Sequence, residues 1–345
     1  MKLIKPNVVI LEQQPGLDGM YKQIELAGRN CYKSEDKITE DGAKAFVDRM
    51  IASGHGAMLE HGTVYLKLPT GLQLSDKYKK NKYSIITLTP GIDPYWAVTT
   101  NYRVMVENNW LDDLQYICEP TKYHEKRVTV RFICDRGILA EFTRHRTFSF
   151  AAESTRFCNY SKNKFGNELT FIIPTWIDET EEEINREFRD TDKDDVSVFV
   201  RALKTLEEEY FTLLNNGWKP QQARQVLPNA LKTELIMTGF ESDWKHFFSL
   251  RSPKAGATGV HPDAAYLADK LYDMMYIEKD ICLSVMHSDE FDGKNNLFKD
   301  GDMVTYNTIH DKNKDEYIID SVTITSKDGE KKYLSREEYF KSLVG

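Results

Sequence analysis

The chain has 345 residues, 41% of them apolar, which is enough to bury a substantial core in one large domain or two. It contains no run of about 18 apolar residues, and its N-terminal apolar run is too short for a signal peptide, so we expect a cytoplasmic protein that does not enter a membrane. The net charge of −8 argues against a nucleic-acid partner, and five scattered cysteines without a C-x-x-C spacing argue against a disulfide framework or a metal site.

Helical spacing of apolar residues predicts two helices near the N-terminus. The first covers about Leu17 to Tyr32, and the second is capped by Thr39 and ends at Ser53-Gly54. Alternating apolar residues then predict a strand over about 62–68. The following segment, about 69–126, has a lysine-rich start and aromatic, strand-like pieces, and we interpret it as an insertion without recognisable chemistry.

A further strand is predicted over Arg127 to Cys134, where the residues alternate with period two. Asp135 is a suitable N-cap for a helix from about Gly137 to Arg146, which would put Arg144-His145-Arg146 at a helix C-terminus. Cations at this end complement the helix macrodipole and need no ligand. For a short basic triplet on its own, this structural explanation is the ordinary one.

The residues that follow the triplet favour a binding site instead. A run of small and aromatic residues, Phe148 to Ala152, leads to Ser154, Thr155 and Arg156, and an exposed ion-paired face would not need such a run. Guanidinium forks and hydroxyl donors are the groups that suit a doubly charged phosphate. The segment therefore predicts a phosphate site that contains an imidazole.

The C-terminal half predicts helices followed by a strand-rich tail. Two of the helices cover about 195–216 and about 263–284. Between them, one helix begins at Pro220 and carries Arg224, and another is capped by Ser242 and ends near Arg251. The tail is predicted to form strands over 303–309, 317–324 and 331–334, a turn at 327–329, and a short helix opened by Ser335 and Glu338. We expect an α+β fold of mixed helices and antiparallel sheet in two parts, 1–286 and a C-terminal β-rich extension of unknown role at 287–345.

The triplet and the serine together resemble the motif of the flavin-dependent thymidylate synthases, the ThyX family. In that motif Arg-His-Arg is followed by seven residues of any type and a Ser, and here Thr147 to Glu153 separate Arg144-His145-Arg146 from Ser154, with Arg156 two positions later. Three more segments resemble the family in the same order along the chain. They are His55 to His61, Gln222 to Pro228 and Trp244 to Arg251.

The resemblance implies a ThyX-type core and an enzyme that converts deoxyuridylate (dUMP) to thymidylate (dTMP). Methylenetetrahydrofolate is the one-carbon donor in this family, and flavin adenine dinucleotide (FAD) takes hydride from NADPH. The family assembles each active site from several subunits of a homotetramer. No protein nucleophile is required in its favoured mechanism, and Ser154 has no recognisable base in the sequence, so we do not expect it to attack the substrate.

Family roles carry over to the matching positions of this chain. Flavin contacts fall on Arg144, His145, Arg146, Phe240, Glu241, Ser242 and His246. Substrate contacts fall on Glu141, Arg144, Glu153, Ser154, Thr155, Arg156, Arg224 and Arg251. Arg251 matches the arginine that stabilises the N3-ionised uracil and is the predicted catalytic residue, because its positive charge makes C5 nucleophilic by charge compensation.

The chain departs from the family pattern at several positions. Where an amide and an acid commonly precede the Ser, it has Ala151-Ala152 and then Glu153, and Ala57 replaces a residue that is commonly hydroxyl-bearing. Cys31 stands near a frequent Ser. These departures leave open a regulatory relative that binds nucleotide without turnover. A nucleic-acid-binding module that reads phosphates through the triplet and Lys77 to Lys82 is disfavoured by the acidic net charge.

Overall fold

The computed structural model describes residues 1–71, 74–162, 165–180, 182–184, 193–277, 303–311, 316–325 and 331–335. The chain forms two compact units, Met1–Leu271 and Tyr272–Gly345. The predicted boundary between 286 and 287 lies outside the described residues, so that division of the chain stays a prediction.

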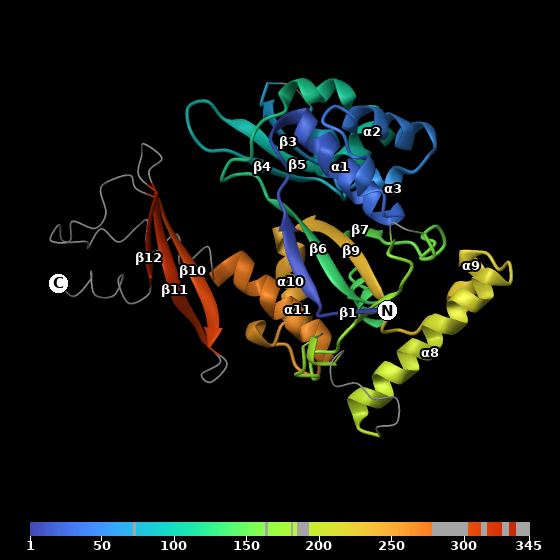
Figure 1. The fold of residues 1–345 in the computed structure, drawn as a ribbon. Coiled ribbons are helices and arrows are strands. Elements are labelled where there is room, and N and C mark those ends of the chain that lie inside the picture. Colours follow the sequence, from blue (N-terminus) through green and yellow to red (C-terminus); the bar gives the residue numbers. More distant parts are fainter. Residues whose placement is uncertain are drawn as a thin grey trace, which may run out of the picture. The chain divides into compact units, whose positions relative to one another are not determined.

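A four-stranded antiparallel sheet in the order β2-β6-β9-β7 forms the centre of the first unit (Figure 1). Its strands are β2 (Asn7–Leu11), β6 (Arg127–Asp135), β9 (Lys232–Phe240) and β7 (Ser149–Ala152). The predicted strand over 127–134 is confirmed as β6, which pairs with β9 along its whole length. β9 has no counterpart among the predicted elements, because seven consecutive residues of it are buried and its sequence therefore lacks the alternation of a half-exposed strand.

The two faces of this sheet differ in chemistry. One face carries an aromatic cluster that joins β6 and the Phe148 turn to two helices, α6 (Arg136–Phe142) and α10 (Glu241–Arg251). The centroids of contacting rings lie 4.6–6.3 Å apart, and the rings belong to Phe132, Phe142, Phe148, Trp244 and Phe247. The opposite face is covered by α1 (Gly16–Tyr32), whose Ala27 packs on Ala151 and Ile236. Small residues at this contact let the helix backbone approach the sheet closely.

A second antiparallel sheet, in the order β3-β5-β4, lies with α1, α2 and α3 (Figure 1). Its elements are β3 (Thr63–Pro69), β5 (Tyr95–Asn101) and β4 (Ile85–Leu88), with α2 (Ala43–Ala52), α3 (Gly56–Leu59), α4 (Ser75–Lys80), α5 (Tyr102–Glu107) and a 3-10 turn (Leu111–Tyr116). Tyr78, Val98 and Met105 of the predicted insertion are fully buried in its core. The insertion is therefore an integral part of a packed layer. The predicted Thr39 cap is wrong, since α2 begins after Gly42 and has no side-chain cap.

The rest of the first unit contains a parallel strand pair and the long predicted helix. β1 (Lys2–Ile4) pairs with β8 (Thr170–Ile172), and Phe171 packs in one cluster with residues of α8 (Asp195–Asn215). The Asp194 carboxylate accepts a hydrogen bond from Ser197 N at 2.9 Å and starts α8. Shorter elements follow: α9 (Pro220–Ala223), a 3-10 turn (Arg224–Val226), a second 3-10 turn (Pro253–Ala255) and α11 (Pro262–Tyr272).

The second unit contains a three-stranded antiparallel sheet of β10 (Met303–Asp311), β11 (Glu316–Thr325) and β12 (Lys331–Ser335). These strands agree with the three predicted for the tail. The predicted turn at 327–329 and the helix after Ser335 lie outside the described residues.

The expected mixture of helices and antiparallel sheet is confirmed, with β1–β8 as a parallel exception. Within the described part of the chain, every helix is too short or too polar to cross a bilayer.

Gly239 of β9 provides a test of this packing. A Cβ at this position would lie 2.5 Å from two ring carbons of Phe148, whereas a Cβ at Gly71 would meet no atom within 4 Å. We expect Gly239→Ala to destabilise the protein by about 1–3 kcal/mol, because the packed ring must shift, and Gly71→Ala to have little effect. Thermal unfolding of both variants measures this. Equal midpoints for the two would contradict the packing described for β9.

Candidate active site

The basic triplet lies in a turn between α6 and β7. Asp135 Oδ1 accepts from Ile138 N at 2.8 Å, so the predicted N-cap is confirmed. The helix ends at Phe142, however, and the prediction that it reaches Arg146 is wrong, because tighter turn bonds from His145 N to Phe142 O and from Phe148 N to His145 O replace the helical pattern. This turn leaves Arg144 and Arg146 exposed and buries His145.

His145, Glu141 and Arg251 form one hydrogen-bonded cluster. The Arg251 Nε donates to His145 Nε2 at 3.1 Å, its Nη1 donates to Glu141 Oε2 at 2.5 Å, and its Nη2 donates to the Glu141 carbonyl at 3.3 Å. The Arg251 and Glu141 side chains are 17% and 28% exposed, so the cluster lies at the surface of the chain. Three residues with predicted site roles, separated by up to 110 positions, are thus brought together.

The environment keeps His145 neutral. Burial, with the Arg251 and His246 side chains nearby, lowers the pKa of His145 to about 4. The hydrogen bond agrees with this, because a guanidinium can only donate and His145 Nε2 must offer a lone pair. The ring lies 4.9 Å from that of Phe247, so the aromatic cluster fixes the imidazole from its other side.

The predicted flavin loop, Phe240 to Ser242, lies at the opposite end of α10 from Arg251. Ser242 is not the N-cap, since α10 begins at Glu241 and the Asp243 carboxylate accepts from Phe240 N at 3.0 Å. Glu241 N donates to Lys126 O, and Ser242 N donates to Glu125 Oε1. All three backbone N–H groups of the loop are therefore engaged within the chain. Glu241 and Arg251 are ten residues apart along α10, which corresponds to roughly 15 Å at the rise of an α-helix.

Ser154 and its neighbours form a tight turn after β7. Ser154 N donates to Cys31 O at 3.0 Å, and Ser154 Oγ accepts from Arg156 N at 3.3 Å. The Arg224 Nη1 donates to Thr155 Oγ1 at 3.2 Å, which joins two predicted substrate residues, while Arg156 remains exposed. Within the described part of the chain, no hydrogen bond or ion pair connects this turn to the Glu141–His145–Arg251 cluster.

Glu153, the remaining predicted substrate residue, is 3% exposed. Its Oε1 accepts from Tyr160 OH at 3.0 Å and its Oε2 accepts from Lys232 Nζ at 2.9 Å, so both oxygens are engaged inside the protein. Sequence analysis missed Tyr160 and Lys232. The alternation of Lys232 and Glu234 ahead of an apolar run was the available indication of a strand with one charged face.

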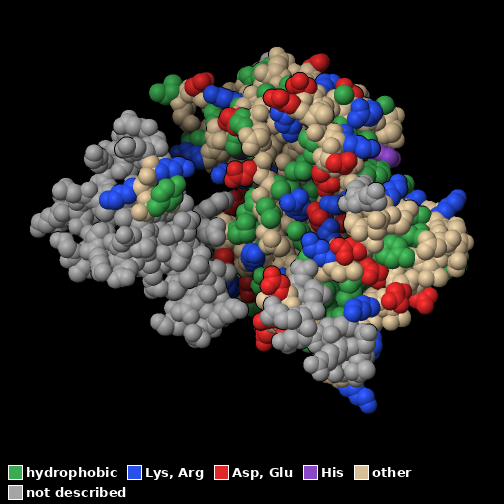
Figure 2. Space-filling model, viewed as in Figure 1, with side chains coloured by type: hydrophobic (Ala, Val, Ile, Leu, Met, Phe, Trp, Pro, Cys, Tyr) green, Lys and Arg blue, Asp and Glu red, His purple; other side chains and the backbone are tan. Residues whose placement is uncertain are grey.

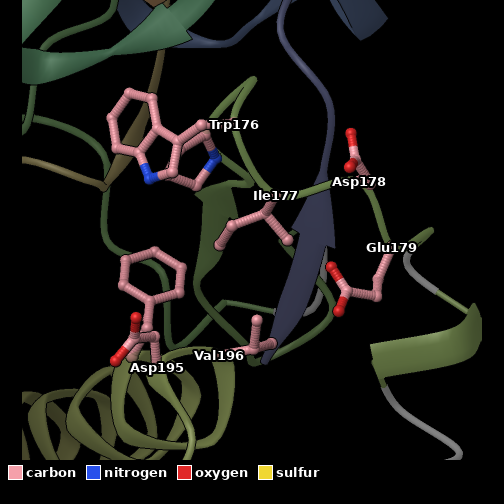
Figure 3. A pocket seen from close by; sticks show the side chains of 8 residues that line it. Trp176, Ile177, Asp178, Glu179, Asp195 and Val196 are labelled. Atoms are coloured by element: carbon pink, nitrogen blue, oxygen red, sulfur yellow. The ribbon is translucent and has the colours of Figure 1, made fainter.

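Charge on the described surface is mixed. Figure 2 shows Lys and Arg interspersed with Asp and Glu on the face drawn. A separate cavity of about 470 Å3 lies between the loop after β8 and the start of α8, and Figure 3 shows its lining. Apolar groups there accompany Asp178, Glu179 and Asp195. Three carboxylates and the lack of any predicted site residue make this cavity a poor match for a phosphate.

Acid titration tests the neutral state of His145. Its lowered pKa means that below pH 6.5 the unfolded chain binds a proton that the folded chain does not, so the free energy of unfolding should fall as pH decreases from about 6.5 to 4. His145→Asn keeps an acceptor without titrating and should reduce this slope. Burial also lowers the pKa of His61, to about 3. His61 contributes the same slope in the parent and in His145→Asn, so it does not affect the comparison.

Denaturant unfolding at several pH values measures the slope, with exposed His55→Asn as the control. A slope in His145→Asn equal to that of the parent would show that His145 takes up its proton over the same pH range in the folded and the unfolded protein, which contradicts the lowered pKa.

Sequence comparison places residues 124–276 in the family described as thymidylate synthase complementing protein. The flavin-dependent thymidylate synthase of Corynebacterium aurimucosum is 25% identical over 258 residues, which cover 73% of this chain and 76% of the relative. The Corynebacterium glutamicum enzyme is 24% identical over 269 residues (76% and 79%), and the Geobacter sulfurreducens enzyme is 28% identical over 251 residues (71% and 73%).

Solved structures with some similarity include thymidylate synthase X from Helicobacter pylori with FAD and dUMP, at 16% identity and a TM-score of 0.34 over 78% of this chain and 92% of that one. The UMP/dUMP methylase PolB from Streptomyces cacaoi matches at 18% identity and a TM-score of 0.36 over 82% and 93%. The segment matched to the family contains the basic triplet, Ser154, Arg224 and Arg251. Residues 124–276 match the family of the thymidylate synthase complementing protein, and the chain is similar to flavin-dependent thymidylate synthases over about three quarters of its length.

Proposed function

We propose that this chain is an FAD-dependent thymidylate synthase that converts dUMP to dTMP, with methylenetetrahydrofolate as carbon donor and NADPH as reductant. Similarity to the flavin-dependent thymidylate synthases supports the flavin-dependent methylation of dUMP. The observation that carries the proposal is the contact of Arg251 with His145, because it joins the basic triplet to the predicted catalytic residue.

The residues available for FAD fit a dinucleotide in their chemistry. Arg144 and Arg146 are exposed guanidinium groups suited to a pyrophosphate, and within the described chain neither has a recorded ion-pair partner. His246, which lies later in the chain on α10, is exposed as well. FAD, when bound, supplies the hydride transfer that side chains cannot perform. The loop from Phe240 to Ser242 would contribute side chains or carbonyls, since its N–H groups are engaged.

The turn after β7 suits the phosphate of dUMP. Ser154 and Thr155 provide hydroxyl groups, and Arg156 and Arg224 provide guanidinium groups. The bond from Arg224 to Thr155 orients one of these groups before substrate arrives. Because the phosphate carries two negative charges, two arginines at one turn compensate it without a metal ion.

Arg251 is suited to stabilising an anionic uracil ring. A guanidinium has five N–H donors, and three are used by His145 and Glu141, so two remain for the substrate. Neutral His145 adds no competing positive charge. The positive charge of Arg251 lowers the energy of the ring ionised at N3, and the extra electron density at C5 makes that carbon the nucleophile.

The chain's own groups do not favour covalent catalysis. Ser154 Oγ accepts from a backbone N–H, and among the described residues no His or Lys hydrogen-bonds to it. Burial raises the pKa of Cys31 to about 11, and burial also raises the pKa of Cys134. A thiol with a raised pKa is a poor nucleophile at neutral pH. The mechanism we propose therefore uses no protein–substrate bond.

We also propose a homotetramer with shared active sites. The separation of about 15 Å along α10 between the flavin loop and Arg251 supports this, because one chain does not bring the two groups together.

A regulatory relative that binds nucleotide without turnover is the second candidate. Ala151 is fully buried against Ala27 and Ile236, so a position that commonly carries a polar side chain in the family contributes none here. This candidate predicts nucleotide binding without chemistry at C5.

The visible absorption spectrum of the purified protein, followed by addition of dUMP, distinguishes the candidates. The synthase predicts a flavin spectrum that dUMP perturbs, and release of tritium from [5-³H]dUMP when NADPH and methylenetetrahydrofolate are present. A flavin-free protein that binds dUMP but releases no tritium would favour the regulatory relative.

Replacement of Arg251 tests its catalytic role. Arg251→Ala should lower kcat/KM by about 10²–10³-fold, because a preorganised charge at the developing anion is lost, while flavin content should stay near that of the parent. Tritium release and the flavin-to-protein ratio measure the two effects. Unchanged turnover would contradict the assignment.

Replacement of Ser154 tests the phosphate turn. Ser154→Ala should weaken dUMP binding by about tenfold or more, since a hydrogen bond to a charged group is lost, yet synthesis should remain measurable at high dUMP. Titration of the flavin spectrum with dUMP gives the affinity. Complete loss of synthesis with unaltered affinity would instead support Ser154 as a nucleophile.

A further inference from the structure

Four charged side chains form a continuous network beneath the Ser154 turn. Lys232 Nζ lies 2.9 Å from Glu153 Oε2 and 2.7 Å from Glu234 Oε1, and Lys33 Nζ lies 2.9 Å from the same Glu234 oxygen. They come from the residue that follows β7, from two positions of β9, and from the αL residue that ends α1. The network therefore joins three elements at one point.

The network is buried and balanced in charge. Side-chain exposures are 2% for Glu153, 15% for Lys232, 12% for Glu234 and 16% for Lys33. These two cations and two anions are joined by one further charge of each sign, Glu35 at 2.8 Å from Lys33 and Arg131 at 3.8 Å from Glu234. Burial opposes ionisation of Glu234, but Lys232 and Lys33 outweigh it and lower its pKa to about 2. Burial likewise opposes the charge on Lys232, and the two carboxylates outweigh it and raise its pKa. Glu234 and Lys232 are thus both ionised at neutral pH.

The two carboxylates depend on Lys232 unequally. Glu234 also meets Lys33 at 2.9 Å and Arg131 at 3.8 Å. For Glu153, Lys232 is the one ion-pair partner within the described part of the chain, and its other oxygen receives the neutral Tyr160 hydroxyl. Loss of Lys232 would therefore leave Glu153, and not Glu234, as a buried charge without a counterion.

Backbone bonds connect Glu153 directly to the predicted phosphate turn. Glu153 N donates to Glu234 O at 2.9 Å, and the next residue, Ser154, donates to Cys31 O. The Asn30 amide donates to both Ala151 O and Glu234 O at 3.1 Å. The charged network and the Ser154 turn are thus directly adjacent and share the backbone of residues 153 and 154.

We propose that Lys232 is a positioning residue for nucleotide binding, which holds the Glu153 carboxylate inside the protein, away from the substrate phosphate, and so fixes the hydroxyl groups of the Ser154 turn. This inference rests on the proposed function. Without Lys232, Glu153 gains solvation only by turning outward, where its negative charge repels the phosphate of dUMP.

Lys232→Met tests the inference through the separation of binding from turnover. We expect the dissociation constant for dUMP to rise by about tenfold or more, and kcat at saturating dUMP to stay within about threefold of the parent, because Arg251 is untouched. The double variant Glu153→Gln/Lys232→Met removes the stranded charge and should return the affinity to within about threefold of the parent.

Lys77→Met is the matched control for loss of stability alone. Lys77 pairs with buried Asp113 at 2.5 Å in the layer of the second sheet, so the variant removes the same type of side chain from a comparable ion pair. It should lower the thermal midpoint without changing dUMP affinity.

The outcomes separate the two proposals. If the parent shows no response of its flavin spectrum to dUMP, the proposed function fails and the positioning role fails with it. If the parent binds dUMP and Lys232→Met binds equally well, the positioning role alone is wrong. It is also wrong if kcat falls with affinity and the double variant restores neither, because Lys232 would then serve only the stability of the fold.

Discussion

Burial of β9 on both faces is the constraint on which the rest of the structure depends. Its aromatic side supports α6 and α10 and thereby fixes His145 and Arg251, while its charged side meets α1 and holds the residue before Ser154. The strand pairs with β6 over nine residues and with β7 over four, so the contacts on its two sides are held by the same hydrogen-bonded strand. The geometry of the Arg251 cluster and that of the phosphate turn are thus both set by a single strand.

The electrostatic environment differs between the two sides of β9. Around His145, burial among aromatic rings favours the uncharged imidazole, and Arg251 is the positive group that hydrogen-bonds to it. Around Lys232, the chain buries full charges and compensates each with a partner of opposite sign. Such pairs contribute little net stability compared with apolar packing, but removal of one member is costly. A buried pair therefore fixes a geometry more firmly than it stabilises a fold.

Sequence predicted the elements with local patterns and missed those defined by distant contacts. The alternation of β6, the Asp135 cap and the apolar stripe of α8 each depend on neighbouring residues, and all three were found. β9 was missed because its apolar run, 235–237, is short and is flanked by polar residues and a glycine that are nevertheless buried. For the candidate site, the motif supplied the predicted residues, and the partnership of Glu153 with Lys232, 79 positions away, could not be inferred from spacing. The triplet was placed on a helix because propensity does not reveal that α6 ends at Phe142.

The departure from the family pattern before Ser154 follows from the same packing. α1 approaches the sheet through Ala27, and the buried Ala151 opposite it leaves no room for a larger polar side chain. The acid of the segment stands instead at Glu153, where the strand has ended and the side chain enters the charged network. An acid that is fully engaged inside the protein cannot also bind the nucleotide. In the function we propose, the contacts to dUMP therefore come mainly from arginine and hydroxyl groups, which makes the direction of Ser154, Thr155 and Arg156 more important than in a site with an additional acidic ligand.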